Sequence, residues 1–275
     1  LSKRGYEAIV KSPYTTQRYD VSKFKDIELG SGKVTYIDGG NQSIYTTASF
    51  TLQFVRIFAV TYEGMKRVAE KKKEFYVLIS RSEKCKIQWF DESGPEEIDA
   101  DSIESAVDML RRYKELEFAN EFENPVLDGN LYEDHEMFIP LITPKLSALS
   151  KTNQLVSDQG TSVVTDLLAL TSLTSWSYPL GFSVHTLYVT KLHARSNYCF
   201  KVETSNPQLI PLLAAHSKDP TFLGYPYGLV YADKMARVTD EEMRYVRIRL
   251  LSKISESSIT QHLNTQNAHI ILDNL

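Results

Sequence analysis

Two short stretches of this sequence decide its fold class: YIDGG at residues 36–40 and VLDG at residues 126–129. In each stretch an apolar run leads into an aspartate that is followed by a glycine. An Asp-Gly pair after a strand most often makes a turn, so neither pair is informative by itself. A helical pattern separates the two pairs, however, and this order favours strands that carry both aspartates to one mouth of a sheet.

The segments around the first stretch predict an antiparallel start to the sheet. We expect a first strand over residues 33–37, ending at Asp38-Gly39-Gly40, and a long second strand over about residues 44–62, where apolar and polar side chains alternate. Residues 75–80 and 85–90 form two further apolar runs joined by a polar linker, which indicates a hairpin. The sheet therefore opens with antiparallel strands.

The segments before the second stretch predict a crossover. Residues 99–123 show helical periodicity, and Pro125 helps to end the helix. Val126 and Leu127 then form a buried strand that we expect to lie parallel to the first one. This order indicates an α/β protein with a ribonuclease-H-like mixed sheet flanked by helices, and with additional C-terminal helices and strands.

The remaining sequence adds weaker elements to this core. Thr239 to Glu242 form a capping box, which predicts a helix beginning at Asp240. The other expected elements are a strand over residues 146–152, a helix over 161–174, and a strand pair over 184–192 and 198–203. We interpret residues 1–275 as a single domain with a core of about 33–240, an N-terminal arm over 1–30 and a C-terminal helical segment over 240–275.

The composition is that of an ordinary folded protein. Hydrophobic residues make up 42% of the 275 positions, which is enough for a sizeable core. The formal net charge of −4 argues against a surface that is basic all over, but it allows a local basic track on an acidic protein. No apolar run approaches the ~20 residues that a membrane span needs. We therefore expect no membrane span and a cytoplasmic location.

The two aspartates, Asp38 and Asp128, are the first candidates for chemistry. Side by side they would form an anionic pocket, and oxygen ligands of this kind are preferred by Mg²⁺ and Mn²⁺. The intervening helix should add a third carboxylate. At ~100° per residue, Glu117 lies near the middle of the helix's apolar stripe and Glu115 points almost the opposite way, so Glu117 is the first choice and Glu115 the reserve.

Four short blocks of this sequence resemble the successive signature blocks of the NurA nucleases. They are YIDGG at residues 36–40, VLDGNL at 126–131, SKT at 150–152, and GYPYGL at 224–229 followed by Ala232-Asp233. The blocks run in family order over roughly residues 33–240. Each block is short, but four in order with a helix between the first two make the match moderately specific.

This resemblance implies a Mn²⁺-dependent nuclease with a ribonuclease-H-like fold. It implies that the protein cuts DNA, forms a homodimer, and works with the hexameric ATPase HerA in resecting double-strand breaks, as archaeal-type NurA proteins do. Mg²⁺ would be an alternative ion, and two ions are expected. Asp38, Glu117, Asp128 and Asp233 would be metal ligands, and Lys151 would lie beside the scissile phosphate.

Further residues are weaker candidates for the same site. His269 is a distant reserve for the fourth ligand, which Asp233 would otherwise supply. Tyr225 and Tyr227 lie close to Asp233 in the sequence, and aromatic rings of this kind often stack on the bases of single strands. We therefore consider both tyrosines as DNA-binding residues.

Two other classes of function remain open. The sugar-kinase, actin and chaperone ATPases also use strand-terminal Asp-Gly turns, but they need paired glycine-rich loops and two large lobes, and this chain has only 12 glycines. The second alternative is a non-catalytic chain that serves as a docking or clamp subunit of an ATPase ring. The complete set of carboxylates speaks against such a loss of activity.

Overall fold

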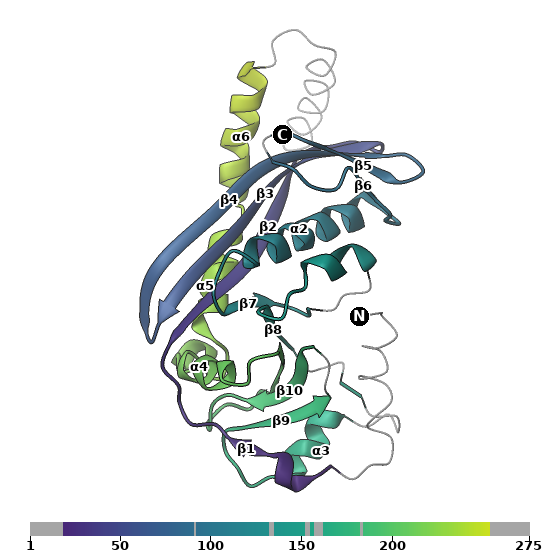
Figure 1. Ribbon diagram of the computed structural model, residues 1–275. Helices are drawn as coiled ribbons and strands as arrows, with labels where there is room; N and C mark the ends of the chain where they lie inside the picture. The colour runs from purple at the N-terminus through teal and green to yellow at the C-terminus, as the bar shows by residue number, and fades with distance from the viewer. Residues whose placement is uncertain are drawn as a thin grey trace, which may run out of the picture.

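The computed structural model describes residues 19–90, 92–131, 135–151, 155–156, 162–181 and 184–253. These residues form an eleven-stranded mixed sheet with helices on both faces (Figure 1). The strand order is β1-β9-β10-β11-β8-β7-β2-β3-β4-β5-β6. This architecture confirms the expected fold class. The two large lobes expected of the ATPase alternative are not found in the described ranges.

The sheet contains three long strands and several short ones. The strands are β1 (Lys25–Asp26), β2 (Lys33–Thr46), β3 (Phe50–Glu63), β4 (Lys66–Arg81), β5 (Cys85–Trp89), β6 (Glu97–Ile98), β7 (Pro125–Asp128), β8 (Ser147–Lys151), β9 (Trp176–Gly181), β10 (Thr186–Lys191) and β11 (Phe200–Thr204). The helices are α2 (Ile103–Ala119), α3 (Val163–Leu170), α4 (Leu209–Ala215), α5 (Tyr227–Ala236) and α6 (Asp240–Lys253), with short 3-10 helices η1 (Val21–Lys23), η2 (Glu136–Leu141) and η3 (Pro220–Phe222).

Strand β2 corrects the expected position of the first two strands. It does not end at Asp38, because its residues pair with β3 from Lys33 onward through Asp38 to Thr46. The strand stays extended through two glycines that leave room for neighbouring backbone: a Cβ on Gly40 would lie 2.4 Å from the carbonyl oxygen of Ala236. The expected long strand over 44–62 is therefore two strands, divided by a turn at residues 47–49.

Helix α2 and strand β7 form the expected crossover. Ser102 caps the helix, its side chain accepting a hydrogen bond from the backbone N–H of Ser105. Strand β7 then pairs in parallel with β2, with Tyr36 opposite Val126 and Ile37 opposite Leu127. The helix is shorter than the expected 99–123, but its place between antiparallel strands and a parallel strand is confirmed.

Each face of the central strands is buried by a different set of helices. Helix α2 covers one face, where Ile37, Ile57 and Leu127 are buried with its own Ala106 and Leu110. Helices α4 and α5 cover the other face (Figure 1). The buried residues there include Val34, Tyr36, Val126, Leu149, Val202, Leu213 and Leu229. Alternate residues of β2, β7 and β8 thus point to opposite faces of the sheet.

The C-terminal half also follows the expected pattern. Strand β8, the antiparallel pair β10–β11 and helix α3 are present, with shorter bounds than expected. The capping box is formed, because the N–H of Glu242 donates to Thr239 Oγ1 at 3.2 Å and the N–H of Thr239 donates to Glu242 Oε2 at 3.1 Å. Of the expected terminal segments, residues 1–18 and 254–275 lie outside the described residues.

The basic run at residues 71–73 lies on exposed β4, where two glutamates pair with its three lysines and neutralise it in part. Lys71 and Lys73 form ion pairs with Glu121 at 2.5 and 2.8 Å, and Lys72 pairs with Glu74 at 3.1 Å. This run is therefore a paired surface rather than a free cationic track. None of the helices in the described ranges is both long and apolar enough to cross a membrane.

Candidate active site

Asp38 and Asp128 lie side by side on neighbouring strands. The parallel register places Ile37 opposite Leu127, so the next residues, Asp38 and Asp128, share the face on which Tyr36 and Val126 are buried. Each aspartate accepts a hydrogen bond at Oδ1 from the N–H of the glycine that follows it, at 2.8 Å for Asp38 and 3.0 Å for Asp128. The backbone thus fixes both carboxylates.

Glu115 belongs to helix α2, which covers the other face of the sheet, and its side chain lines the same cavity as the two aspartates. Its Oε1 lies 2.6 Å from where a Cβ on Gly39 would be, so only a glycine leaves room for it there. Arg111 Nη1 donates to Glu115 Oε1 at 2.5 Å, and Arg112 Nη1 donates to Oε2 at 2.9 Å. Glu115 is 3% exposed, and two arginines therefore hold its buried carboxylate.

Tyr225 and Lys151 complete the rim of this cluster. The hydroxyl of Tyr225 donates to Asp128 Oδ1 at 3.1 Å. Lys151 is the last residue of β8 and is exposed, and its charge acts on Asp128. It lies two residues after Leu149, which is paired with Asp128, so its side chain leaves the sheet on the face of the two aspartates.

A cavity of about 730 Å³ opens over these residues. Asp38, Glu115, Asp128 and Lys151 all line it. The other lining residues come mostly from α2 and from the ends of β7 and β8, and they are Ser105, Asp108, Met109, Arg111, Arg112, Gly129 and Ser150. The structure therefore gathers an aspartate from the middle of β2, the last residue of β7, a helical glutamate and a lysine around one space.

Burial and the repulsion between the negative charges of Asp38, Glu115 and Asp128 raise the pKa values of the two aspartates. Burial, together with the charge of Glu115, raises the pKa of Asp38 from 3.8 to about 7, and Asp128 adds to the shift. Burial also raises the pKa of Asp128, although Tyr225 and Lys151 partly offset this effect. Burial and Asp128 raise the pKa of Tyr225, so its hydroxyl remains a donor. Added positive charge would relieve this repulsion.

The donor set fits a hard divalent cation. No described residue donates a hydrogen bond to the second oxygen, Oδ2, of Asp38 or Asp128, so each aspartate has an oxygen to offer. Carboxylate oxygens are the ligands that Mg²⁺ and Mn²⁺ prefer. No group of three metal-binding side chains is assembled among the described residues. The arrangement thus offers the paired carboxylates of Asp38 and Asp128, with Asp108 on the same cavity wall, while Glu115 is held by its arginines.

Two of the expected ligands do not line this cavity, although the charge of Asp233 acts on Tyr225 at its rim. Glu117 pairs with Lys114 at 2.6 Å and its side chain is 38% exposed. Asp233 is on α5 with a side chain that is 53% exposed and paired with Arg237 at 3.0 Å. Neither residue lines the cavity. The cavity lies over the end of β7, beside helix α2. It is therefore lined by Glu115, on the side of the helix, and not by Glu117, which the sequence places on the apolar stripe.

The expected DNA-binding tyrosines also occupy different places. The hydroxyl of Tyr225 is bonded to Asp128, and its ring contacts Phe200 with 5.2 Å between centroids. Tyr227 packs edge-on against Tyr62, at 6.4 Å between centroids, as part of the core beneath α5. Tyr225 thus belongs to the site, whereas Tyr227 contributes to packing. His269 lies outside the described residues.

The sequence interpretation missed the two arginines of the site. Arg112 Nη1 also donates to the carbonyl oxygen of Asp128 at 3.3 Å, which ties α2 to the end of β7. Arg111 and Arg112 precede Glu115 by four and three positions, the spacings at which helix side chains meet. Glu117 also follows a basic residue, Lys114, by three positions, so this spacing alone does not distinguish Glu115 from Glu117.

Replacement of Asp38 by Asn is expected to stabilise the protein in the absence of metal. The folded protein holds the Asp38 proton up to about pH 7, whereas an unfolded chain releases it near 3.8, so stability falls as pH rises through that window. The variant lacks this loss, and above pH 7 it should be more stable by on the order of 1–3 kcal/mol.

Thermal unfolding in EDTA at about pH 8 and about pH 4 measures this difference. The advantage of Asp38→Asn should shrink towards the lower pH, because the parent aspartate is protonated in the folded state there and becomes increasingly protonated in the unfolded chain. An advantage that is equal at both pH values, or a less stable variant at the higher pH, would contradict the proposed repulsion.

Comparison with known proteins gives matches only at the level of structure. No protein-family model matches the chain, and no curated protein does. The NurA nuclease from Sulfolobus solfataricus superposes with a TM-score of 0.51 at 12% identity, covering 92% of this chain and 97% of its own. A second NurA structure gives a TM-score of 0.60 at 9% identity, covering 95% of this chain and all of its own.

A third structure is more distant. The endonuclease V of Ciona intestinalis bound to inosine-containing DNA gives a TM-score of 0.44 at 11% identity, covering 90% of this chain and 100% of its own. Both NurA structures extend over almost the whole of this chain, and they have the mixed α/β architecture seen here. The resemblance predicted from four short blocks is therefore confirmed in three dimensions, and this chain has the NurA fold.

Proposed function

We propose that this chain is a metal-dependent deoxyribonuclease whose active site is the cluster of Asp38, Glu115, Asp128 and Lys151. One observation carries the proposal: two aspartates, Asp38 half-buried and Asp128 exposed, lie at neighbouring positions of parallel strands, each with a free oxygen, in a chain with the NurA fold. The raised pKa of Asp38 marks a site that favours added positive charge. A divalent cation supplies such charge.

Each residue of the cluster has a separate role in this proposal. Asp38 and Asp128 hold the ion, and Tyr225 keeps Asp128 oriented through its Oδ1. Lys151 offsets negative charge on the phosphate that is cut. When bound, the ion polarises the phosphate and lowers the pKa of a water molecule. Mn²⁺ is the proposed ion, with Mg²⁺ as the alternative.

The number of ions depends on Glu115. The NurA resemblance implies two ions, and a second ion would need a further carboxylate. Both oxygens of Glu115 accept hydrogen bonds from arginines in this structure. We therefore propose that Glu115 binds a second ion only after it releases Arg111, the less buried of the two arginines.

The biological setting is proposed from the NurA resemblance. The chain would act as a homodimer, as an exonuclease and single-strand endonuclease, with a hexameric HerA-type ATPase in the resection of double-strand breaks. A cytoplasmic location fits that role. These points depend on the resemblance rather than on a surface of the described residues.

One observation favours a second candidate function. Arg111 lines the cavity, and its Nη1 also lies 3.2 Å from the carbonyl oxygen of Gly39. A cation of the protein itself thus already neutralises part of the cluster. This arrangement would suit a non-catalytic clamp or docking subunit that keeps the fold and has no need of metal.

Degradation of labelled single-stranded and double-stranded DNA by the purified chain tests the two functions. The nuclease proposal expects cleavage in Mn²⁺, weaker or equal cleavage in Mg²⁺, and none in EDTA. If the purified chain alone does not cleave DNA, the assay is repeated with its cognate hexameric ATPase. Continued silence under every metal would overturn the nuclease proposal and support the clamp subunit.

A further inference from the structure

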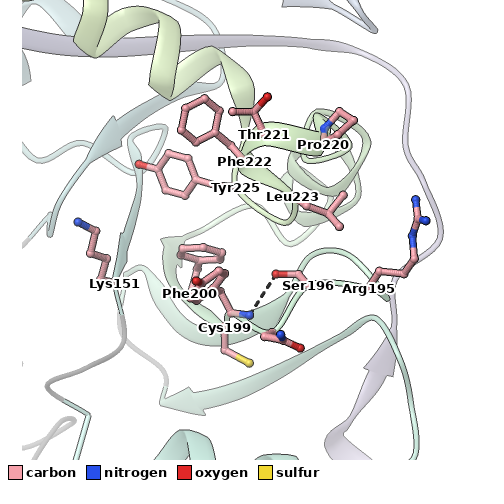
Figure 2. Close-up of a pocket in the computed structure, with 12 residues that line it drawn as sticks. Lys151, Arg195, Ser196, Cys199, Phe200, Pro220, Thr221, Phe222, Leu223 and Tyr225 are labelled. Atoms are coloured by element: carbon pink, nitrogen blue, oxygen red, sulfur yellow. Dashed lines mark hydrogen bonds between the residues drawn. The ribbon is translucent and has the colours of Figure 1, made fainter.

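A second groove begins where the candidate active site ends. It has a volume of about 690 Å³, and it shares Lys151 and Tyr225 with the cluster described above. Its walls are the segment from Arg195 to Phe200 and the segment from Pro220 to Tyr225. Figure 2 shows Lys151 and Arg195 at opposite ends of the groove, with Phe222 and Tyr225 between them.

The groove presents aromatic rings to solvent. Tyr198 is 69% exposed and Phe222 is 43% exposed, although both rings are large enough to be buried in a core. Phe200 and Tyr225, in ring contact at 5.2 Å, form the inner part of the same surface. Exposed rings gathered in a hollow indicate a binding surface rather than packing.

The lining of the groove is positively charged, which favours a negatively charged ligand. Its lining residues, all within the described ranges, include the cations Lys151 and Arg195 and no aspartate or glutamate. Such a lining suits a polyanion, on a protein whose formal net charge is −4. The continuity with the aspartate cluster places that polyanion next to the phosphate that the proposed nuclease would cut.

The two walls touch at Gly224 and Ser196, and hydrogen bonds within each segment hold its shape before any ligand arrives. A Cβ on Gly224, whose φ is +92°, would lie 2.3 Å from Ser196 Oγ, so the glycine allows the walls to touch. The N–H of Gly224 donates to the carbonyl oxygen of Ser217 at 2.9 Å, and Ser196 Oγ accepts from the N–H of Tyr198 at 3.1 Å. A preformed groove costs less to fill.

We propose that this groove holds an unpaired DNA strand next to the active site, with bases stacked on Phe222 and Tyr198 and phosphates near Arg195 and Lys151. Stacking needs the face of a base, and a base pair within a duplex keeps its faces covered. The groove therefore makes the protein prefer single-stranded DNA or frayed ends. This inference rests on the proposed nuclease function only for the position of the cut.

Strand binding in EDTA tests the groove without cleavage. The probe is a short fluorescein-labelled oligothymidylate, and its affinity is measured by fluorescence anisotropy. Stacking contributes about 1–3 kcal/mol per base, so Tyr198→Ala and Phe222→Ala should each weaken binding by about 5- to 150-fold. Phe222→Leu, which keeps apolar bulk, should also weaken binding, and this excludes a mere loss of packing.

Three controls make the result specific. Tyr245→Ala removes an equally exposed tyrosine, 67% exposed on α6 and outside the groove, and should bind like the parent. An abasic strand of the same length should bind the parent about as weakly as the normal strand binds Phe222→Ala. A blunt duplex should bind the parent and Phe222→Ala equally. Arg195→Ala should lower the slope of log affinity against log salt by about one.

The two proposals fail in different ways. Unchanged oligothymidylate affinity in both Tyr198→Ala and Phe222→Ala, or an equal loss of duplex binding, overturns the groove even if the parent cleaves DNA. Loss of strand binding in these variants supports the groove even if no metal gives cleavage. In that case only the nuclease proposal fails.

Discussion

The Asp128→Asn variant is expected to lose DNA cleavage by more than about 100-fold. Residues that merely support a metal ligand typically contribute 10–100-fold to affinity or activity, and Asp128 is proposed to be a ligand itself. An amide in its place removes the negative charge and leaves only one oxygen. Tyr225 can still donate to that oxygen, so the fold around the site should survive.

Initial rates on labelled single-stranded DNA in Mn²⁺ measure this loss. Asp233→Asn is the comparison variant. Asp233 is bonded to Arg237 and does not line the cavity, but its charge acts on Tyr225, so this variant should lose less activity than Asp128→Asn. Equal losses in both variants would show that the site extends to α5, as the sequence alone suggests. Retention of activity in Asp128→Asn would remove Asp128 from the site.

The Glu115→Ala variant is expected to have the largest effect on stability. Arg112 is 5% exposed and loses its carboxylate partner in this variant, and breaking a buried ion pair typically costs about 3–5 kcal/mol. Glu117→Ala also takes a partner from a buried cation, Lys114, but Lys114 keeps Glu92 at 3.7 Å and the carbonyl oxygen of Ser93, so this variant should cost less. The free energies of unfolding in urea compare the two variants.

Variants of Glu115 and Glu117 also show whether Glu115 has a structural role alone or a role in cleavage as well. Glu115→Gln keeps the size of the side chain and one of its two oxygens, so this variant is compared under conditions where it remains folded. If Glu115 serves the proposed chemistry, Glu115→Gln cleaves more slowly than Glu117→Gln. Equal stability of Glu115→Ala and Glu117→Ala would contradict the buried ion-pair network.

Much of the fold could be predicted because local patterns and topology agree. Alternating residues predict β3, the capping box predicts the start of α6, and the Asp-Gly pairs predict where β2 and β7 meet. The course of β2 through Asp38, Gly39 and Gly40 could not be predicted. Glycine usually ends a strand, and only the close approach of Glu115 and Ala236 explains why it continues one here.

The helical carboxylate shows where a sequence pattern fails. The periodicity of α2 locates the face that meets the sheet, but the cluster lies at the end of β7, beside the helix. Tyr225 is a similar case, because its bond to Asp128 joins residues 97 positions apart. Contacts of this kind depend on how α2 and the segment before α5 lie over the strand ends, and local spacing does not contain that information.

The most direct measurement is the binding of Mn²⁺ to the parent and to the Asp38→Asn/Asp128→Asn double variant by titration calorimetry. This measurement requires neither DNA nor an ATPase partner. The account predicts heat of binding in the parent, displacement of the ion by EDTA, and no binding in the double variant. Equal binding by both proteins would contradict the claim that the paired aspartates form the metal site.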